Sequence, residues 1–262
     1  MDEAFRIMAF AAGAIAALMV VVWLISVVMR DASIVDIAWG AGFVVVAWTA
    51  FAVGDGPESR KWLITLMVSA WGLRLSGYLA WRNLGKGEDY RYQKMRKYWG
   101  DRFPIVSLFT VFLLQGVLMF VVSLPVQMAQ MSGGPDGLVW ISFVGLGVFA
   151  VGLFFETVGD LQLAAFKADP ANEGKVMDRG LWRYTRHPNY FGDFVVWWGI
   201  FLVAMARPEL AWTAIGPLVM SVLLIRVSGV ALLERNLKRR RPGYEEYIKR
   251  TSSFFPLPPR NA

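Results

Sequence analysis

Long apolar stretches alternate with short polar segments along the whole chain. Seven of these stretches come close to the ~20 residues that an α-helix needs to cross a bilayer. They cover roughly residues 4–29, 34–53, 62–82, 104–130, 137–158, 190–206 and 210–233. Lipid cannot satisfy an exposed backbone, so spans of this length predict helices. The pattern predicts an all-α, polytopic membrane protein with seven transmembrane helices.

The connections between these stretches are of two kinds, strongly basic and nearly neutral. The chain has 262 residues, 56% of them hydrophobic and 18% charged, with a net charge of +7. Basic residues gather after the third, fifth and seventh stretches, and the other connections carry few of them. By the positive-inside rule, this alternation places the N-terminus outside and the C-terminus in the cytoplasm. The charge therefore indicates a bilayer partner and no nucleic acid.

The chain has no cysteine and a single histidine. This composition excludes disulfides, thiolate nucleophiles, cysteine-bound metal clusters and multi-histidine metal sites, so we expect no metal. The chemistry left open uses carboxylates, tyrosines, arginines or an organic cofactor. Gly145, Gly147 and Gly152 follow no strand, and helix packing explains them better than a nucleotide loop. Without a low-complexity linker or internal repeat, we expect one domain over residues 1–262.

Ionisable groups inside membrane spans are expensive, so each is a candidate for function. Asp36 lies about one turn inside the second stretch. Arg74, Tyr78 and Arg82 follow one another at intervals of four, which forms one stripe on the third helix. If the stripe faces Asp36, the group either contacts a substrate or forms an Asp36–Arg74 pair that only fastens two helices. Both interpretations stay open.

Segment 83–103 interleaves basic and aromatic residues, including Asn83, Lys86, Tyr90 and Arg91. Such a mixture suits phosphates and a stacked base. An interfacial aromatic belt with basic flanks gives the same pattern.

Glu156 and Asp160 are four residues apart where the fifth stretch leaves the membrane. Like charges at this spacing repel unless a cation or a hydrogen-bonding group lies between them. Ribose hydroxyls would serve, and so would Lys167 or arginines of the C-terminal tail.

Segment 180–193 holds the densest group of polar and aromatic residues and runs into the sixth stretch. Its candidates are Trp182, Arg183, Tyr184, Arg186, His187, Asn189, Tyr190 and Asp193. Pro188 suits the first turn of a helix, so Asn189 lies near a helix N-terminus, which favours anions. The segment predicts one wall of a site for an anionic, ring-bearing cofactor. For His187, cofactor contact, helix capping and acid–base catalysis all stay open.

Three motifs carry a resemblance to a known family. They are Gly180-Leu-Trp-Arg-Tyr-Thr-Arg-His-Pro-Asn-Tyr-Phe-Gly-Asp193, the upstream Asp160 and Lys167, and the tail Glu234-Arg-Asn-Leu, Tyr244-Glu-Glu-Tyr and Phe255-Pro256. The chain resembles the steroid 5-alpha-reductase family, most strongly over 156–256, and looks like a bacterial membrane homologue of it.

The resemblance implies a seven-helix, NADPH-dependent reductase of the bacterial inner membrane. It would be a monomer with active-site loops facing the cytoplasm, acting on a 3-oxo-4-ene steroid or another lipidic enone. The implied cofactor positions are Asn83, Lys86, Glu156, Asp160, Lys167, Asn189, Asp193, Glu234, Arg235 and Arg250. The family's acid pair falls on Val35-Asp36. Its helix-three tyrosine has no match in frame, because Gly72 stands there, and Tyr78 lies a turn and a half further on.

The implied chemistry is consistent with the residues. Reducing a carbon–carbon double bond conjugated to a carbonyl needs a hydride, which NADPH supplies. It also needs an acid that stabilises the charge growing on the carbonyl oxygen. Asp36 is the candidate acid, with Tyr78 or Arg74 as a second donor.

Two other classes of protein remain. Isoprenylcysteine carboxyl and phospholipid methyltransferases carry a similar Arg-His-Pro-x-Tyr and a glutamate-bearing tail, and they bind S-adenosylmethionine. That cofactor has no phosphate, so it needs less positive charge than these loops supply. A non-enzymatic lipid-binding or transport protein is the third class, although the matching interrupted helices of transporters are not seen. The reductase is the favoured prediction.

Overall fold

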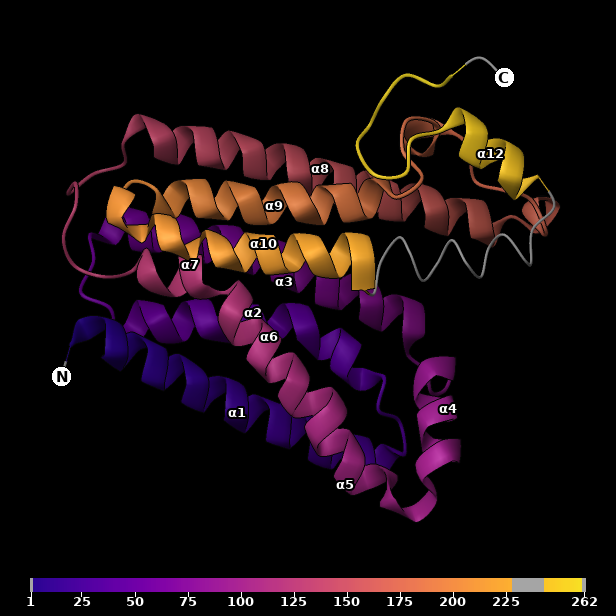
Figure 1. Cartoon of the computed structure of the whole chain (residues 1–262), viewed down its shortest axis with the longest axis horizontal. Coiled ribbons are helices and arrows are strands. Elements are labelled where there is room, and N and C mark those ends of the chain that lie inside the picture. Colours follow the sequence, from indigo (N-terminus) through magenta and orange to yellow (C-terminus); the bar gives the residue numbers. More distant parts are fainter. Residues whose placement is uncertain (1, 228–242, 261–262) are drawn as a thin grey trace. The chain divides into compact units, whose positions relative to one another are not determined.

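The computed structural model describes residues 2–227 and 243–260, which form helices joined by short loops (Figure 1). The chain divides into two compact units. The first comprises Met1–Phe143 with Ile200–Gly216, and the second comprises Val144–Gly199 with Pro217–Ala262. Six helices of the described part are long and apolar enough to cross a membrane, so a multi-pass membrane protein is confirmed. A seventh span and the orientation stay predictions.

The first unit follows the expected order of spans up to the third. Its elements are α1 (Glu3–Met29), α2 (Ile34–Val53), α3 (Glu58–Asn83), α4 (Tyr90–Trp99), the 3-10 turn η1 (Gly100–Arg102), α5 (Phe103–Ser107), the π-helical η2 (Leu108–Leu113), α6 (Leu114–Val122), α7 (Leu124–Met128) and the 3-10 segment η5 (Pro208–Ala214). The expected fourth span, 104–130, is thus built from several consecutive pieces rather than one regular helix.

The second unit contains most of two long helices and the C-terminal segment. Its elements are α8 (Trp140–Ala168), η3 (Pro170–Asn172), η4 (Gly180–Arg183), α9 (Pro188–Ala204), α10 (Ile215–Val222), the π-helical η6 (Leu223–Val227) and α12 (Tyr244–Arg250). At 1.5 Å per residue, the 17 residues of α9 extend about 25 Å, which is short of a hydrocarbon core of about 30 Å. For this reason α9, the expected sixth span, is absent from the six that length and composition support.

Close approach of α2 and α3 organises the first unit. A Cβ added to Gly40 of α2 would lie within 3.0 Å of the Gly72 carbonyl oxygen and of the Ser76 hydroxyl. Ser76 Oγ also accepts a hydrogen bond of 2.8 Å from the backbone N–H of Ala41. Small residues let helix backbones approach in a membrane, where no hydrophobic effect drives them together. The Gly40–Gly72 contact therefore fixes the register of the two helices.

A buried arginine closes the end of the first unit at which α3 begins. Arg60 has 1% of its surface exposed. Its Nε donates to the carbonyl of Ala129 at 2.7 Å, and its Nη2 donates to those of Met131 at 2.7 Å and Gly133 at 3.0 Å. These carbonyls follow the end of α7, where a helix leaves its last acceptors unsatisfied. Arg60 thus ties the α7–α8 loop to α3.

Glycines also bring α8 and α9 together in the second unit. A Cβ on Gly152 of α8 would meet the backbone of α9 at Gly192 and Val196. A Cβ on Gly199 of α9 would meet α8 at Gly145 and Phe149. Helix packing is thereby confirmed as the role of Gly152, whereas Gly147 has open space around it.

Gly40→Ala tests the contact that sets the α2–α3 register. We expect a destabilisation of about 1–3 kcal/mol, because the added methyl group meets backbone that has no room to move. The measurement is the thermal unfolding midpoint in detergent. Gly77→Ala on α3 is the matched control, because its Cβ meets nothing within 4 Å. There the better helix propensity of alanine leaves stability equal or slightly higher. Equal midpoints for the two variants would contradict the assigned contact.

Candidate functional site

Asp36, in the first turn of α2, is held by two residues of α4. Arg91 Nη2 donates to one carboxylate oxygen at 2.6 Å, and the Tyr92 hydroxyl donates to the other at 2.9 Å. Asp89, which caps α4 by accepting from the N–H of Arg91, also accepts from Arg91 Nε at 2.9 Å. The ion pair of Asp36 is therefore made with α4, where the sequence had suggested Arg74 of α3.

A second ion pair fixes the loop before α4. The Glu88 side chain is 8% exposed and accepts two hydrogen bonds from Arg96, at 2.9 and 2.8 Å. It also accepts from the backbone N–H of Ala32, between α1 and α2, at 2.8 Å. Burial alone raises the pKa of Glu88, but the hydrogen bonds from Arg96 and Ala32 outweigh burial, so the pKa lies below its usual value. Glu88 thus stabilises the position of α4 as an anion.

The predicted stripe on α3 is present. Arg74, Tyr78 and Arg82 lie along one side of α3, and the Arg82 guanidinium lies 5.5 Å from the centre of the Tyr78 ring. The Tyr78 ring also lies 6.0 Å from that of Trp81. The role of Tyr78 and Arg74 as proton donors stays a prediction.

The predicted cofactor residues after α3 lie in an exposed loop and at the start of α4. Asn83 ends α3 and accepts from Arg82 Nε at 3.0 Å. Lys86 is exposed, between two glycines of positive φ. Tyr90 is 48% exposed. Within this predicted group, the charge of Arg91 is neutralised by ion pairs with Asp36 and Asp89.

Segment 180–187 of the second unit is clamped between α8 and the C-terminal segment. The Trp182 indole donates to the Gly159 carbonyl at 3.0 Å, and the Tyr247 hydroxyl of α12 donates to the Trp182 carbonyl. Arg186 is 7% exposed, and its Nη1 donates to the carbonyls of Ile248, at 3.2 Å, and Thr251. These bonds give Trp182 and Arg186 a positioning role within the candidate site.

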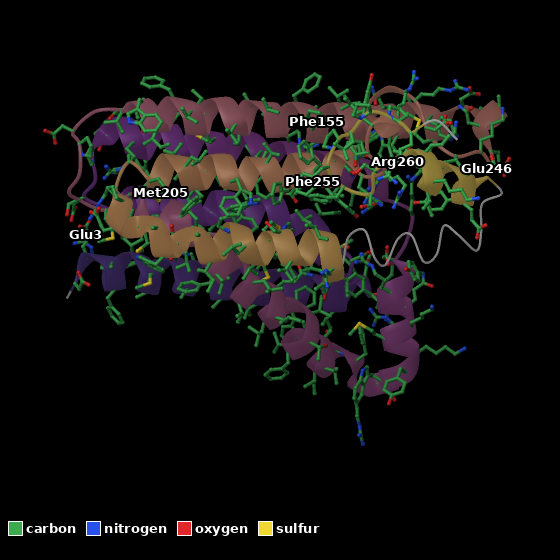
Figure 2. The ribbon with its side chains drawn as sticks, turned by 45° about the horizontal axis from the view of Figure 1, so that its top comes forward. Glu3, Phe155, Met205, Glu246, Phe255 and Arg260 are labelled. Atoms are coloured by element: carbon green, nitrogen blue, oxygen red, sulfur yellow. The ribbon has the colours of Figure 1, made fainter. Side chains whose placement is uncertain are left out.

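Backbone pairing completes this clamp. Thr185 and Ser252 form an isolated parallel bridge, in which Arg186 N donates to Ser252 O at 2.9 Å. The Phe191 ring of α9 lies between two others, with centroids 5.0 Å from Phe155 of α8 and 6.1 Å from Phe255 of the C-terminal segment. Phe155 and Phe255 are labelled in Figure 2. Arg183 and Tyr184 of the same segment are exposed at its outer side.

Glu156 and Asp160 are both buried on α8, 3% and 4% exposed. Asn189 Nδ2 in the first turn of α9 donates to Asp160 Oδ1 at 3.1 Å. The Asn189 Oδ1 atom is buried and has no hydrogen-bond partner among the described residues. Asp193, one turn later on α9, is 9% exposed. The second unit therefore gathers three carboxylates and one unsatisfied acceptor where α8 and α9 meet.

His187 is 3% exposed, and its ring stacks on that of Tyr190, with centroids 5.6 Å apart and planes 7° from parallel. Its backbone N–H donates to Thr185 Oγ1 at 3.3 Å. This arrangement suits a residue that shapes the start of α9. Among the described residues, no group of three or more acidic, histidine or cysteine side chains is placed to hold a metal ion.

The remaining predicted cofactor residues that the structure describes are exposed on the surface of the second unit. Lys167 is exposed near the end of α8. Arg250 ends α12 and pairs with Asp178 at 3.5 Å, both about 40% exposed. Glu234 and Arg235 lie outside the described residues.

Two functional candidates were missed by reasoning from the sequence. Tyr92 lies in the first turn of α4, two residues after Tyr90, and its position opposite Asp36 depends on where α4 packs. Gln162 of α8 accepts from the N–H of Leu181 at 2.9 Å and so fixes the start of η4. The one local signal was Asp89, a helix cap that places Arg91 and Tyr92 in a first turn.

Residues 22–251 match a family described as a protein of unknown function, DUF1295. The chain belongs to this family.

Curated relatives add two similarities. An uncharacterized protein of Schizosaccharomyces pombe is 23% identical over 267 aligned residues, which cover 90% of this chain and 76% of the relative. A probable O-methyltransferase, ustE, of Ustilaginoidea virens is 43% identical over 53 residues, which cover 20% of this chain and 18% of that protein. No solved structure matches the chain.

Glu88→Gln tests the anchor of α4 through its pH dependence. We expect a loss of about 1–3 kcal/mol near pH 7, because charged hydrogen bonds to Arg96 weaken. Because the pKa of Glu88 is lower in the folded than in the unfolded protein, its charge stabilises the fold at every pH above the unfolded pKa of about 4.3. This stabilisation is lost as the pH falls through the folded pKa. The unfolding midpoints of wild type and variant therefore converge below about pH 4. Asp101→Asn, at an exposed position, serves as the control. A difference that stays constant from pH 7 to 3 would be inconsistent with this anchor.

Arg186→Met tests the clamp on segment 180–187. Losing the charged hydrogen bonds to the Ile248 and Thr251 carbonyls removes about 2 kcal/mol of local stability. We expect faster tryptic cleavage after Lys249 and Arg250, measured by mass spectrometry. Arg183→Met is the matched control, because Arg183 is exposed. Identical cleavage rates in the two variants would refute the clamp.

Proposed function

We propose that this protein is an NADPH-dependent reductase of a carbon–carbon double bond conjugated to a carbonyl in a lipidic substrate. The observation that carries the proposal is the hydrogen bond from the Tyr92 hydroxyl to Asp36 at the start of a membrane helix. Such a reduction needs a proton donor that stabilises charge on the carbonyl oxygen. The resemblance to steroid 5-alpha-reductases supports a 3-oxo-4-ene steroid as the substrate class.

Residues of the second unit fit a nucleotide. The buried carboxylates of Glu156, Asp160 and Asp193 are acceptors for ribose hydroxyls or a carboxamide N–H. Asn189 Oδ1 is a buried acceptor that lacks a partner among the described residues, and such an atom is normally satisfied in a complete site. Exposed Arg183 supplies positive charge for phosphates. When bound, NADPH supplies the hydride.

Residues of the first unit fit the proton-transfer step. Arg91 neutralises Asp36 from one side, so the carboxylate stays an acceptor and orients the Tyr92 hydroxyl. In this arrangement, we propose that the Tyr92 hydroxyl turns from Asp36 to the substrate carbonyl oxygen and gives up its proton there. Arg91, which bonds Asp36 and lies 5.2 Å from the centre of the Tyr92 ring, then offsets the negative charge left on Tyr92 until a proton from water restores the hydroxyl. A tyrosine serves because its neutral hydroxyl both donates and accepts a hydrogen bond.

A second function rests on one specific observation. The 53-residue similarity to a probable O-methyltransferase favours methyl transfer from S-adenosylmethionine. Buried acidic residues near Asn189 also suit ribose hydroxyls of that cofactor. Methyl transfer to a carboxylate requires no proton donor, so the Tyr92–Asp36 pair would then only fasten α4.

Ligand binding separates the two functions. The purified protein in detergent is heated with NADPH, NADH or S-adenosylmethionine, and the unfolding midpoint is recorded. A ligand at 100 times its Kd stabilises by about 2.7 kcal/mol. We expect stabilisation by NADPH that is lost in Asn189→Ala, with the midpoint of the ligand-free variant as a check on folding. Stabilisation by S-adenosylmethionine alone would eliminate the reductase proposal.

Tyr92→Phe tests the proton donor. NADPH oxidation with a 3-oxo-4-ene steroid should slow by about 10²–10⁴-fold, the range of general acid catalysis, while NADPH binding stays unchanged. Tyr98→Phe is the matched control on the same helix, because Tyr98 is 79% exposed. A full rate in Tyr92→Phe would remove Tyr92 as the donor.

A further inference from the structure

Helix α4 differs in direction from α1 and α2. Within the first unit, α4 runs crosswise to α1 and α2, at the end where α1 finishes and α2 begins (Figure 1). A helix that lies across the end of membrane-spanning helices runs along the membrane surface. The ten residues of α4 are amphipathic, which is typical of interfacial helices.

Both faces of α4 carry cations, but only those of the inner face form ion pairs among the described residues. On the inner face, Arg91 pairs with Asp36 and Asp89, and Arg96 pairs with Glu88. The acidic residues of the loop before α4, Glu88 and Asp89, are both paired in this way. On the outer face, Lys94 and Lys97 are exposed, and Arg102 is exposed just after the helix. Lys97 and Arg102 form no ion pair with any residue that the structure describes.

Aromatic rings flank these cations. Tyr98 and Trp99 are 79% and 41% exposed, and their rings meet edge to face with centroids 5.1 Å apart. Amphipathic rings of this kind occupy the headgroup level of a bilayer. Asp101 is the one exposed acidic residue between Lys94 and Arg102, so the surface keeps a net positive charge.

From this geometry we propose that a surface formed by Lys94, Lys97 and Tyr98 on the outer face of α4, and by Arg102 of η1 just after it, binds the phosphates of anionic phospholipids. The occupant follows from charge complementarity. Lys94 and Lys97 of α4 and Arg102 of η1 are exposed cations, Lys97 and Arg102 form no ion pair among the described residues, and lipid phosphates are the anions that a membrane surface offers to such a group. The aromatic rings then contact the acyl chains just below the headgroups. The proposal does not depend on the proposed reductase activity.

Binding of this kind has a predictable size. A lysine or arginine near an anionic membrane surface contributes about 1 kcal/mol, which corresponds to about 5-fold in affinity. The attraction is screened by salt, because the Debye length shortens to about 3 Å at 1 M ionic strength. Anionic lipid should therefore bind more tightly than zwitterionic lipid, and high salt should reduce the difference.

The test is native mass spectrometry of the whole protein in mild detergent, titrated with phosphatidylglycerol or with phosphatidylcholine of the same acyl chains. The wild type is compared with a variant carrying Lys94→Gln, Lys97→Gln and Arg102→Gln. We expect the wild type to prefer phosphatidylglycerol. In the variant, the affinity for phosphatidylglycerol falls by about 5-fold for each charge removed.

Two controls make the result specific. Arg179→Gln, Lys249→Gln and Arg260→Gln together remove three exposed charges from the second unit and should leave lipid affinity unchanged. Lys94→Arg with Lys97→Arg keeps the charge and should retain binding. Equal lipid affinity of the wild type and the Lys94/Lys97/Arg102 variant would overturn the proposal, as would an equal loss in the second-unit variant.

Discussion

A charge near the hydrocarbon core needs a partner within the protein, because lipid offers none. The Asp36 carboxylate meets this requirement through Arg91 and Tyr92, and the whole of α4 is positioned by that bond and by the Glu88–Arg96 pair. At the other end of α3, Arg60 meets the same requirement with three backbone carbonyls. Both ends of the first unit are thus organised by the pairing of polar groups. Between them, Gly40 and Gly72 set the contact of α2 and α3.

In the second unit, the segment before α9 also contains polar groups that need partners within the protein. Its polar segment 180–187 has no regular secondary structure beyond one 3-10 turn, so its backbone groups need other partners. The C-terminal segment supplies them through the Thr185–Ser252 bridge and the guanidinium of Arg186. This clamp leaves Asn189 and the carboxylates of α8 beside one another as the candidate nucleotide contacts. The clamp and the proposed nucleotide contacts are therefore adjacent in sequence but differ in role.

Lipid and substrate would act on α4 from different faces. Its inner face carries the residue proposed to donate a proton, and its outer face carries the cations proposed to hold phospholipid. A helix fixed on both sides keeps Tyr92 at Asp36 with little freedom. The mixture of basic and aromatic residues in segment 83–103 suggested either a cofactor site or an interfacial belt, and the choice between them stays a prediction.

The sequence by itself determined the helical membrane class, because runs of about 20 apolar residues have no other stable form in lipid. It also singled out candidate residues, since Asp36, Glu156, Asp160 and Asn189 stand out against an apolar background. Span boundaries were less certain where helices break or shorten, as in 104–130 and α9. Only the tertiary structure decided which groups meet. Asp36 bonds to residues 55 and 56 positions away, and Arg186 bonds to carbonyls 62 and 65 positions away. No local pattern encodes such pairs, because they depend on how helices pack and on which faces they turn toward one another.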